Sequence, residues 1–426
     1  MIGKKLFDRL KKFDPELCKL LKLSLDRQMS SLSLISTDSA ASPLSQYLKG
    51  SVLGNDYIGH NSIEHYSRVE QLTIKRTCEI FKSEHAIVRL GNIIAASRVV
   101  LQALANPGDK ILSFNLRKKE YCTGSQMQYD FVKFALDPET FKLNFDKLRY
   151  LAVRHRPKLI ICSPVHYPHN IDYKKLRAIA DEVQANVWVD LGQNAGLIVA
   201  GKMDSPVPYA DVVTFEASNS LHGPQSGIIL SREKFAAPLE QKIIDTGHVS
   251  LKKNVLAALA ITLREITCDE YLDYVDQVIT NARALEDGLK QSGIETFCSP
   301  TENHLVLARL DQDGKIVSEK LEQAGLLVSP ETLMTSNDQI SYPILRLSSL
   351  DPTTRSLNAE DMFTVGMTLG EFLKSKQDSN AIESVRMIIQ EMVENLPLFS
   401  DEWLPEAEIV QERDPELMMK AMIYGM

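Results

Sequence analysis

Short apolar segments alternate with amphipathic ones through the middle of the chain. The apolar segments are rich in β-branched and aromatic residues, as buried strands are, and they cover residues 111–115, 158–163, 186–190, 211–216 and 227–231. Between them lie segments with apolar residues three and four positions apart, such as residues 173–183, which predict amphipathic helices. Strands that alternate with helices predict an α/β fold with a mostly parallel sheet and helices on both faces.

The pattern changes after about Ile244. Residues 251–290 predict two amphipathic helices, and strand-like segments follow at residues 295–299, 304–310 and 344–349. A helical pattern at residues 362–376 comes next. We expect a smaller mixed α/β domain in this part of the chain.

These patterns divide the chain into an N-terminal arm, a large domain, a small C-terminal domain and an acidic extension, at residues 1–50, 51–275, 276–399 and 400–426. In the arm, Leu6, Leu10 and Phe13 have helical spacing with lysines between them. We expect it to pack on the protein or on a second subunit, with attachment to a membrane surface as the alternative. The extension carries apolar residues among its acids, so it either docks in a partner's groove or folds on its own body.

Composition narrows the classes of function. The 426 residues are 44% hydrophobic and 24% charged, with a formal net charge of −8, so the chain has no basic footprint for nucleic acid. No apolar run is long enough for a transmembrane helix, and the first residues lack the features of a secretory signal. The six cysteines are scattered singly, which is typical of a reduced compartment. We expect a cytoplasmic protein.

Ligands of open α/β sheets bind at the carboxyl ends of the strands. Asp190 and Ser163 end predicted strands, and the turn after Glu216 lies at the same rim. These positions are the first candidates for chemistry.

Several segments resemble serine hydroxymethyltransferases, and they occur in the family's order at residues 34–43, 68–76, 106–112, 189–214, 221–230 and 302–310. The chain is identified as a member of that family. The resemblance implies the aspartate-aminotransferase fold (fold type I) and pyridoxal phosphate as the cofactor. It also implies an active site at a dimer interface and transfer of a one-carbon unit between serine and tetrahydrofolate.

The resemblance assigns a role to several polar residues. Asp190 matches the aspartate that keeps the pyridine nitrogen protonated, and Tyr121 takes the place of the ring-stacking histidine. Arg346 matches the arginine that binds the carboxylate of the amino-acid substrate. Thr37 and Tyr57 match substrate-side positions, and Gly59 follows Tyr57 where the family has its catalytic glutamate.

Other positions depart from the family's pattern. Asn219 stands where the family has the lysine that forms the Schiff base, and Ser218 replaces the preceding histidine. A carboxamide does not form an imine. Gln193 replaces a histidine, and Asn92 begins a helix where the family binds phosphate with Ser-Gly-Ser. Residues 247–251 keep one glycine of the family's second phosphate loop.

Other ionisable residues offer weaker candidates. Lys118, Lys119, Lys252 and Lys253 are expected to bind an anion rather than to form the imine. His166 and His169 flank Tyr167 at a spacing that suggests a metal, but no cysteine or carboxylate set completes it, so we predict no metal site.

Three functions follow. The first is a pseudoenzyme that has lost covalent attachment of pyridoxal phosphate and acts by binding, as a homodimer or as the partner of a homologue or of another protein. The second is a repurposed small-molecule enzyme that binds pyridoxal phosphate, pyridoxamine phosphate or another ligand without a covalent bond. The third is residual hydroxymethyl transfer.

Overall fold

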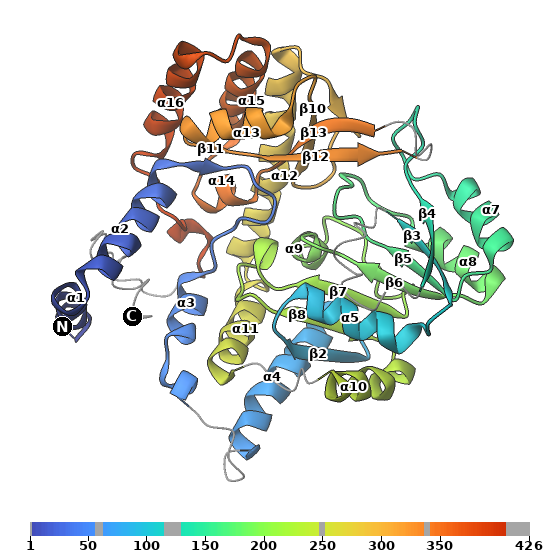
Figure 1. Cartoon of the computed structure of the whole chain (residues 1–426). Coiled ribbons are helices and arrows are strands. Elements are labelled where there is room, and N and C mark those ends of the chain that lie inside the picture. Colours follow the sequence, from blue (N-terminus) through green and yellow to red (C-terminus); the bar gives the residue numbers. More distant parts are fainter. Residues whose placement is uncertain (1, 56–62, 115–128, 247–251, 336–340, 406–426) are drawn as a thin grey trace.

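The fold is described from a computed structural model that covers residues 2–55, 63–114, 129–246, 252–335 and 341–405, with the backbone alone for residues 2–7 and 63–67. Figure 1 shows a sheet-containing body, a smaller layered part beyond the long helix α12, and a helical arm that projects from them. The helices are α1 (Ile2–Phe13), α2 (Pro15–Ser30), α3 (Pro43–Lys49), η1 (Val52–Asn55), α4 (Ile63–Phe81), α5 (Ile93–Leu104), α7 (Phe145–His155), α8 (Tyr173–Val183), α9 (Ala195–Val199), η2 (Asn219–Leu221), η3 (Glu233–Phe235), α10 (Ala236–Asp245), α11 (Lys253–Glu265), α12 (Asp269–Gln291), α13 (Gly314–Gln323), α14 (Leu350–Thr354), α15 (Ala359–Lys374), α16 (Ser379–Val393) and η4 (Asp401–Trp403).

The main sheet has seven strands in the order β2-β8-β7-β6-β5-β3-β4. Its strands are β2 (His85–Leu90), β3 (Lys110–Phe114), β4 (Asp130–Phe134), β5 (Leu159–Cys162), β6 (Asn186–Asp190), β7 (Val212–Glu216) and β8 (Gly227–Ser231). Five neighbouring strands pair in parallel, and β8 runs antiparallel between β7 and β2. The predicted α/β fold with a mostly parallel sheet is therefore confirmed.

Alternate residues of each central strand enter two different cores, because successive side chains of a strand point to opposite faces. In β5, Leu159 and Ile161 pack on the side of α5 and α10, whereas Ile160 and Cys162 pack on the side of α7, α8, α11 and α12. The strands are apolar on both faces for this reason.

The smaller part is built on a four-stranded antiparallel sheet in the order β12-β13-β10-β9. Its strands are β9 (Thr296–Phe297), β10 (Leu305–Arg309), β12 (Ser329–Met334) and β13 (Ser341–Ser348). Helices α12, α13, α15 and α16 contribute leucine, valine and phenylalanine side chains to its separate core. A second, smaller sheet with its own core is thus present, while the division of the chain into four parts, with a small C-terminal domain at residues 276–399, stays a prediction.

The N-terminal arm is helical, as its spacing predicted, and its C-terminal end is tied to the small part. Strand β1 (Leu32–Ser33) pairs with β11 (Leu326–Leu327), and the buried Arg355 guanidinium donates to the carbonyl oxygen of Ser31 at 2.6 Å. Arg27 also forms an ion pair with Glu322 at 2.6 Å. Among the helices described, none is long and apolar enough to cross a membrane.

The beginning of the acidic extension packs on the body. The Trp403 indole Nε1–H donates to the carbonyl oxygen of Thr353 at 2.8 Å, and its ring centroid lies 5.6 Å from that of Tyr274. The Ser400 N–H donates to the Thr354 carbonyl oxygen at 2.8 Å. Residues 400–405 therefore fold on the chain itself, while residues 406–426 lie outside the described part.

Candidate functional site

Asp190 ends β6 at the rim where the parallel strands finish. Its side chain is buried, and its Oδ1 accepts a hydrogen bond from the Gly192 N–H at 3.2 Å. Gly192 has a φ of 55°, a left-handed conformation that glycine adopts without strain. The turn thereby holds a carboxylate in a fixed place at the end of a central strand.

The turn after β7 places Ser218 and Asn219 at the same rim. Asn219 begins the short helix η2, is 6% exposed and has a φ of 63°. Its carbonyl oxygen accepts from the His222 N–H at 3.1 Å. Asparagine tolerates the left-handed region better than most residues, so the sequence suits the turn.

A serine fastens this turn to the one after β6. The Ser220 hydroxyl donates to the carbonyl oxygen of Gln193 at 2.5 Å and accepts from the Gly196 N–H at 3.1 Å. The Tyr271 hydroxyl donates to the Ser220 carbonyl oxygen at 2.8 Å. The buried Gln193 and Asn219 and the half-buried Ser218 therefore belong to one tightly held pair of turns, beside Asp190.

Asn92 caps α5 with its own side chain. Its Oδ1 accepts from the Ala95 N–H at 2.8 Å, so one of the free amides at the helix N-terminus is already satisfied. A Cβ placed on Gly227 would lie 2.2 Å from the Asn92 carbonyl oxygen. The start of α5 therefore lies directly against β8, and only glycine leaves room for that approach.

A second carboxylate, Glu216, is near that helix end. Glu216 ends β7 and pairs with Gly227, the residue that contacts Asn92. Burial raises the pKa of Glu216, and the negative charge of Asp190 raises it further, while a hydrogen bond with Gln225 acts in the opposite direction. Two acidic residues thus lie near each other at the rim.

Arg346 lies in β13 and is 4% exposed. Its Nη1 donates to the Val165 carbonyl oxygen at 3.4 Å, and its Nη2 lies 3.9 Å from Glu331 Oε1. Burial lowers the pKa of the neighbouring His304 to about 3, and the positive charge of Arg346 contributes. A β-bridge between Ile35 and Leu347 brings the turn that carries the exposed Thr37 close to this end of β13.

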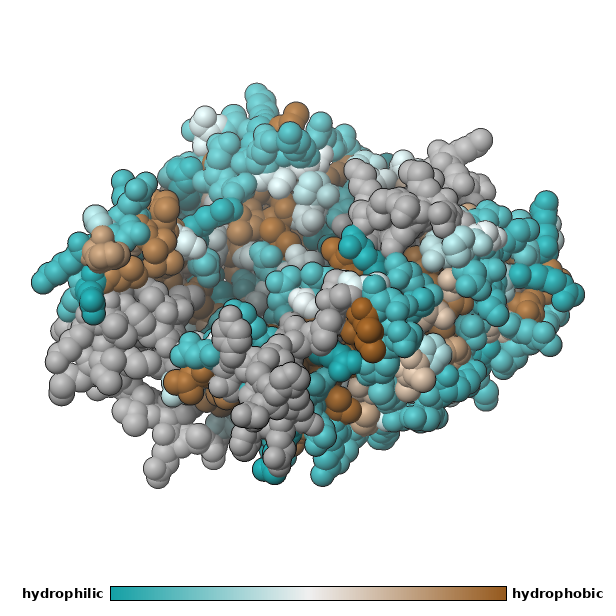
Figure 2. Space-filling view, turned by 60° about the horizontal axis from the view of Figure 1, so that its bottom comes forward, coloured by the Kyte–Doolittle hydropathy of each residue, from teal (hydrophilic) through white to brown (hydrophobic). Residues whose placement is uncertain are grey.

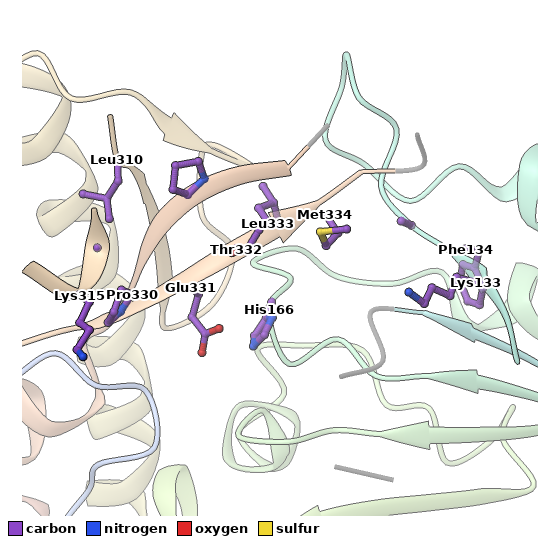
Figure 3. Close-up of a pocket in the computed structure, with 13 residues that line it drawn as sticks. Lys133, Phe134, His166, Leu310, Lys315, Pro330, Glu331, Thr332, Leu333 and Met334 are labelled. Carbon is purple, nitrogen blue, oxygen red and sulfur yellow. The ribbon is translucent and has the colours of Figure 1, made fainter. Parts of the chain in front are cut away.

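A cavity of about 590 Å³ opens between the main sheet and β12. Figure 3 shows Glu331 reaching from β12 towards His166, with Lys133 on the side of the main sheet and Lys315 on the side of α13. Apolar side chains complete the wall, among them Phe134, Leu310, Pro330, Leu333 and Met334. The cavity can hold an organic molecule of moderate size that carries charge.

A sequence model of the family described as serine hydroxymethyltransferase matches residues 10–369. This match covers most of the 426 residues. The chain belongs to the serine hydroxymethyltransferase family. Serine hydroxymethyltransferases typically bind pyridoxal phosphate, and the observed sheet agrees with the fold of the family's enzymes.

Several residues that the resemblance assigned to the serine hydroxymethyltransferase site cannot be placed. Tyr57, Gly59 and Tyr121, together with Lys118, Lys119 and residues 247–251, lie outside the described residues. Lys252 is exposed, and Lys253 is buried at the start of α11. Helix α11 packs on the face of the sheet opposite to α5. The other predicted site residues fall into two places. Arg346 lies in the small part of the chain, whereas one rim of the main sheet carries Asp190, Gln193, Ser218, Asn219 and Asn92.

The two histidines considered for a metal are held differently. His169 is buried, with its Nδ1 3.5 Å from Glu302 Oε1 and its ring centroid 5.4 Å from that of Tyr167. His166 lines the 590 Å³ cavity instead. Within the described ranges, no group of three or more histidine, cysteine, aspartate or glutamate residues gathers to hold a metal.

Two acidic residues of this serine hydroxymethyltransferase-family site were not singled out from the sequence. The sequence marks Glu216 only as the end of a strand and gives no sign of a role for Glu331. No local pattern identifies either side chain, because each gains its role from a partner distant in sequence, Gly227 and Arg346 respectively. Strand β12, which carries Glu331, was itself not among the strands expected from the sequence.

Proposed function

We propose that this protein is a pseudoenzyme of the serine hydroxymethyltransferase family that acts by binding. In this proposal it does not attach pyridoxal phosphate covalently. The observation that carries the proposal is Asn219, a buried carboxamide in a rigid turn at the rim of the sheet, at the position that the sequence assigns to the Schiff-base lysine. An amide nitrogen is not a nucleophile that condenses with an aldehyde.

The phosphate end of the site supports the same proposal. A helix N-terminus binds phosphate through its free amides and its dipole. Here the Asn92 side chain takes one amide of α5, and the acidic residue Glu216 is the strand partner of Gly227, which contacts Asn92. We infer that the described residues suit the ring nitrogen of pyridoxal phosphate, through Asp190, but suit neither its aldehyde nor its phosphate.

The partner in this proposal is a second copy of the chain or a homologue. Large apolar side chains are exposed on neighbouring elements, namely Leu44 and Tyr47 on α3, Val52 on η1 and Leu72 on α4. Helix α11 packs on all three elements, so these residues belong to one region. Figure 2 brings the underside of Figure 1 forward and shows separate apolar patches on a largely hydrophilic surface. Exposed apolar patches of this kind favour association.

A second candidate function is non-covalent binding of pyridoxal phosphate, pyridoxamine phosphate or a related ligand by a repurposed enzyme. The buried Asp190 favours it, because a carboxylate held at the end of β6 could pair with a protonated ring nitrogen. Residual hydroxymethyl transfer is the third candidate and needs a substitute for the lysine.

Titration of the purified protein with pyridoxal phosphate separates these functions. We expect no aldimine absorbance band and no saturable rise in melting temperature. A rise without a band, lost in Asp190→Asn, would favour the second candidate. A saturable band together with conversion of serine to glycine in the presence of tetrahydrofolate would refute the pseudoenzyme.

We also propose a cytoplasmic location. The five cysteines in the described part of the chain, Cys18, Cys78, Cys162, Cys268 and Cys298, are free thiols, as expected in a reducing compartment. Cell fractionation with an antibody tests this, and recovery with a secreted or organelle fraction would contradict it.

A further inference from the structure

Glu331, which lines the 590 Å³ cavity, forms an ion pair with Arg346, a buried residue behind the lining. They lie on paired strands, since Arg346 of β13 is opposite Ser329 of β12 and Glu331 is two residues further along β12. Residues two apart in a strand share a face, so the two side chains project to the same side of the small sheet. The distance of 3.9 Å between Nη2 and Oε1 is an ion pair rather than a close charge-assisted hydrogen bond.

The two partners differ in their access to the cavity. The Glu331 side chain is 21% exposed and lines the cavity, whereas the Arg346 side chain is 5% exposed and is not among the lining residues. Figure 3 shows the Glu331 carboxylate standing in the opening between β12 and His166. A molecule in the cavity therefore meets Glu331 first, and reaches the guanidinium when that side chain turns aside.

The remaining charges of the cavity favour an anion. Lys133 and Lys315 both line it, and Glu331 is the one acidic residue among the lining residues described. Phe134, Leu310, Leu333 and Met334 provide apolar contact area. The planar guanidinium of an arginine matches a carboxylate in two-pronged geometry. The chemistry suits a small carboxylic acid with an apolar body.

We propose that Glu331 is a specificity-determining residue that competes with the carboxylate of such a ligand for Arg346. The Glu331 carboxylate balances the positive charge of Arg346. A ligand carboxylate must therefore displace the Glu331 side chain in order to bind Arg346. The inference rests on the proposed function, because it supplies the ligand class for a family member that acts by binding.

The test is calorimetric titration with benzoate, which joins a carboxylate to an apolar ring, in the absence of pyridoxal phosphate. Benzyl alcohol is the uncharged comparison. We expect Glu331→Gln to bind benzoate about tenfold more tightly than the natural protein, or more. Arg346→Gln should lose the binding, Arg346→Lys should retain part of it, and benzyl alcohol should not distinguish the variants.

A matched control is Glu295→Gln. It removes the carboxylate from an ion pair with Arg309 at 2.7 Å, in which both side chains are exposed to solvent. It should leave benzoate binding unchanged. Equal or weaker binding by Glu331→Gln, binding that survives in a folded Arg346→Gln, or no binding by any variant would each overturn the proposal. Because pyridoxal phosphate is absent, these outcomes are independent of whether the cofactor attaches to a lysine.

Discussion

At the scale of single residues, buried ionisable side chains decide how the protein responds to pH. His222 is buried among aromatic rings, with its ring centroid 4.5 Å from that of Tyr274 and 4.9 Å from that of Phe399. Its Nδ1 lies 3.0 Å from the carbonyl oxygen of Ala40. Burial lowers the pKa of His222 to about 4, against the smaller opposite effect of that hydrogen bond. The folded protein therefore keeps this imidazole neutral.

The consequence is a loss of stability in acid. Between the ordinary histidine pKa of about 6.5 and the folded value of about 4, the unfolded chain binds a proton that the folded chain does not. This one group lowers the free energy of unfolding by about 3 kcal/mol as the pH falls across that window. Its stabilisation is complete above the window.

The variant His222→Asn tests whether His222 makes the protein less stable as the pH falls. Asparagine tolerates the left-handed backbone of position 222, where φ is 57°, but does not titrate. The variant should be less stable than the natural protein at neutral pH, because it loses packing, yet it should lose about 2 kcal/mol less between about pH 7 and about pH 4.5. Urea unfolding at both pH values measures the difference, with His155→Asn as the control. Equal acid losses in the natural protein and His222→Asn would contradict the argument.

The residues of the site differ in how far the sequence predicts them. Asp190 and Asn219 follow from motifs that flank them without gaps, and the structure places both at the expected rim. The proximity of Glu216 to the N-terminus of α5 depends on β8, which runs back beside β7 and carries Gly227 against Asn92. A contact made by the return of a strand is not contained in any local spacing, so the sequence could not reveal it.

At the scale of elements, residues 400–405 bind to the body of the protein and hold two of its helices together. Trp403 in η4 packs on Tyr274 of α12 and donates to Thr353 of α14. Trp403 therefore attaches residues 400–405 to both helices. The sequence left open whether residues 400–426 dock on a partner or fold on the body, and their described beginning does the latter.

Trp403→Ala should lower the free energy of unfolding by about 2 kcal/mol, because it removes a partly buried aromatic ring together with its hydrogen bond to the Thr353 carbonyl oxygen, which keeps the Ser356 N–H as a donor. Deletion of residues 400–426 should lower the melting temperature as well. Asp401→Asn, an exposed change in the same turn, is the control. Thermal unfolding followed by circular dichroism gives the comparison. An unchanged melting temperature in Trp403→Ala would show that Trp403 does not stabilise the fold.

Elements with a strong periodic pattern were predicted closely. Helix α8 and strand β8 have the predicted bounds, and the two helices expected in residues 251–290 are α11 and α12. Strands β2 and β4 and helix α16 were not anticipated. Strands β2 and β4 are the two edges of the main sheet, and β4 has only its last residue buried, so its apolar signal is weak. The order of the strands in the sheet depends on pairing between segments distant in sequence, which no local pattern predicts.

At the scale of the whole molecule, association is the main expectation that follows from the surface. Val52 is 79% exposed, and Leu72 lies on α4 in the same α11-packed region. Replacing both by aspartate would place charges in an apolar interface and should turn a dimer into a monomer. Light scattering coupled to gel filtration measures the mass. Tyr150→Asp, on the exposed face of α7, should leave it unchanged, and a natural protein that is already monomeric in isolation would contradict self-association.

The central claim is that the family's fold is kept while the covalent bond to the cofactor is not. It is tested most directly by incubating the protein with pyridoxal phosphate, reducing with borohydride and measuring the intact mass, followed by peptide mapping. The account predicts an unmodified chain, apart from trace labelling of exposed lysines that does not saturate. Stoichiometric addition of one pyridoxyl phosphate group at a single lysine would contradict it and would show that another lysine has taken over from the position of Asn219.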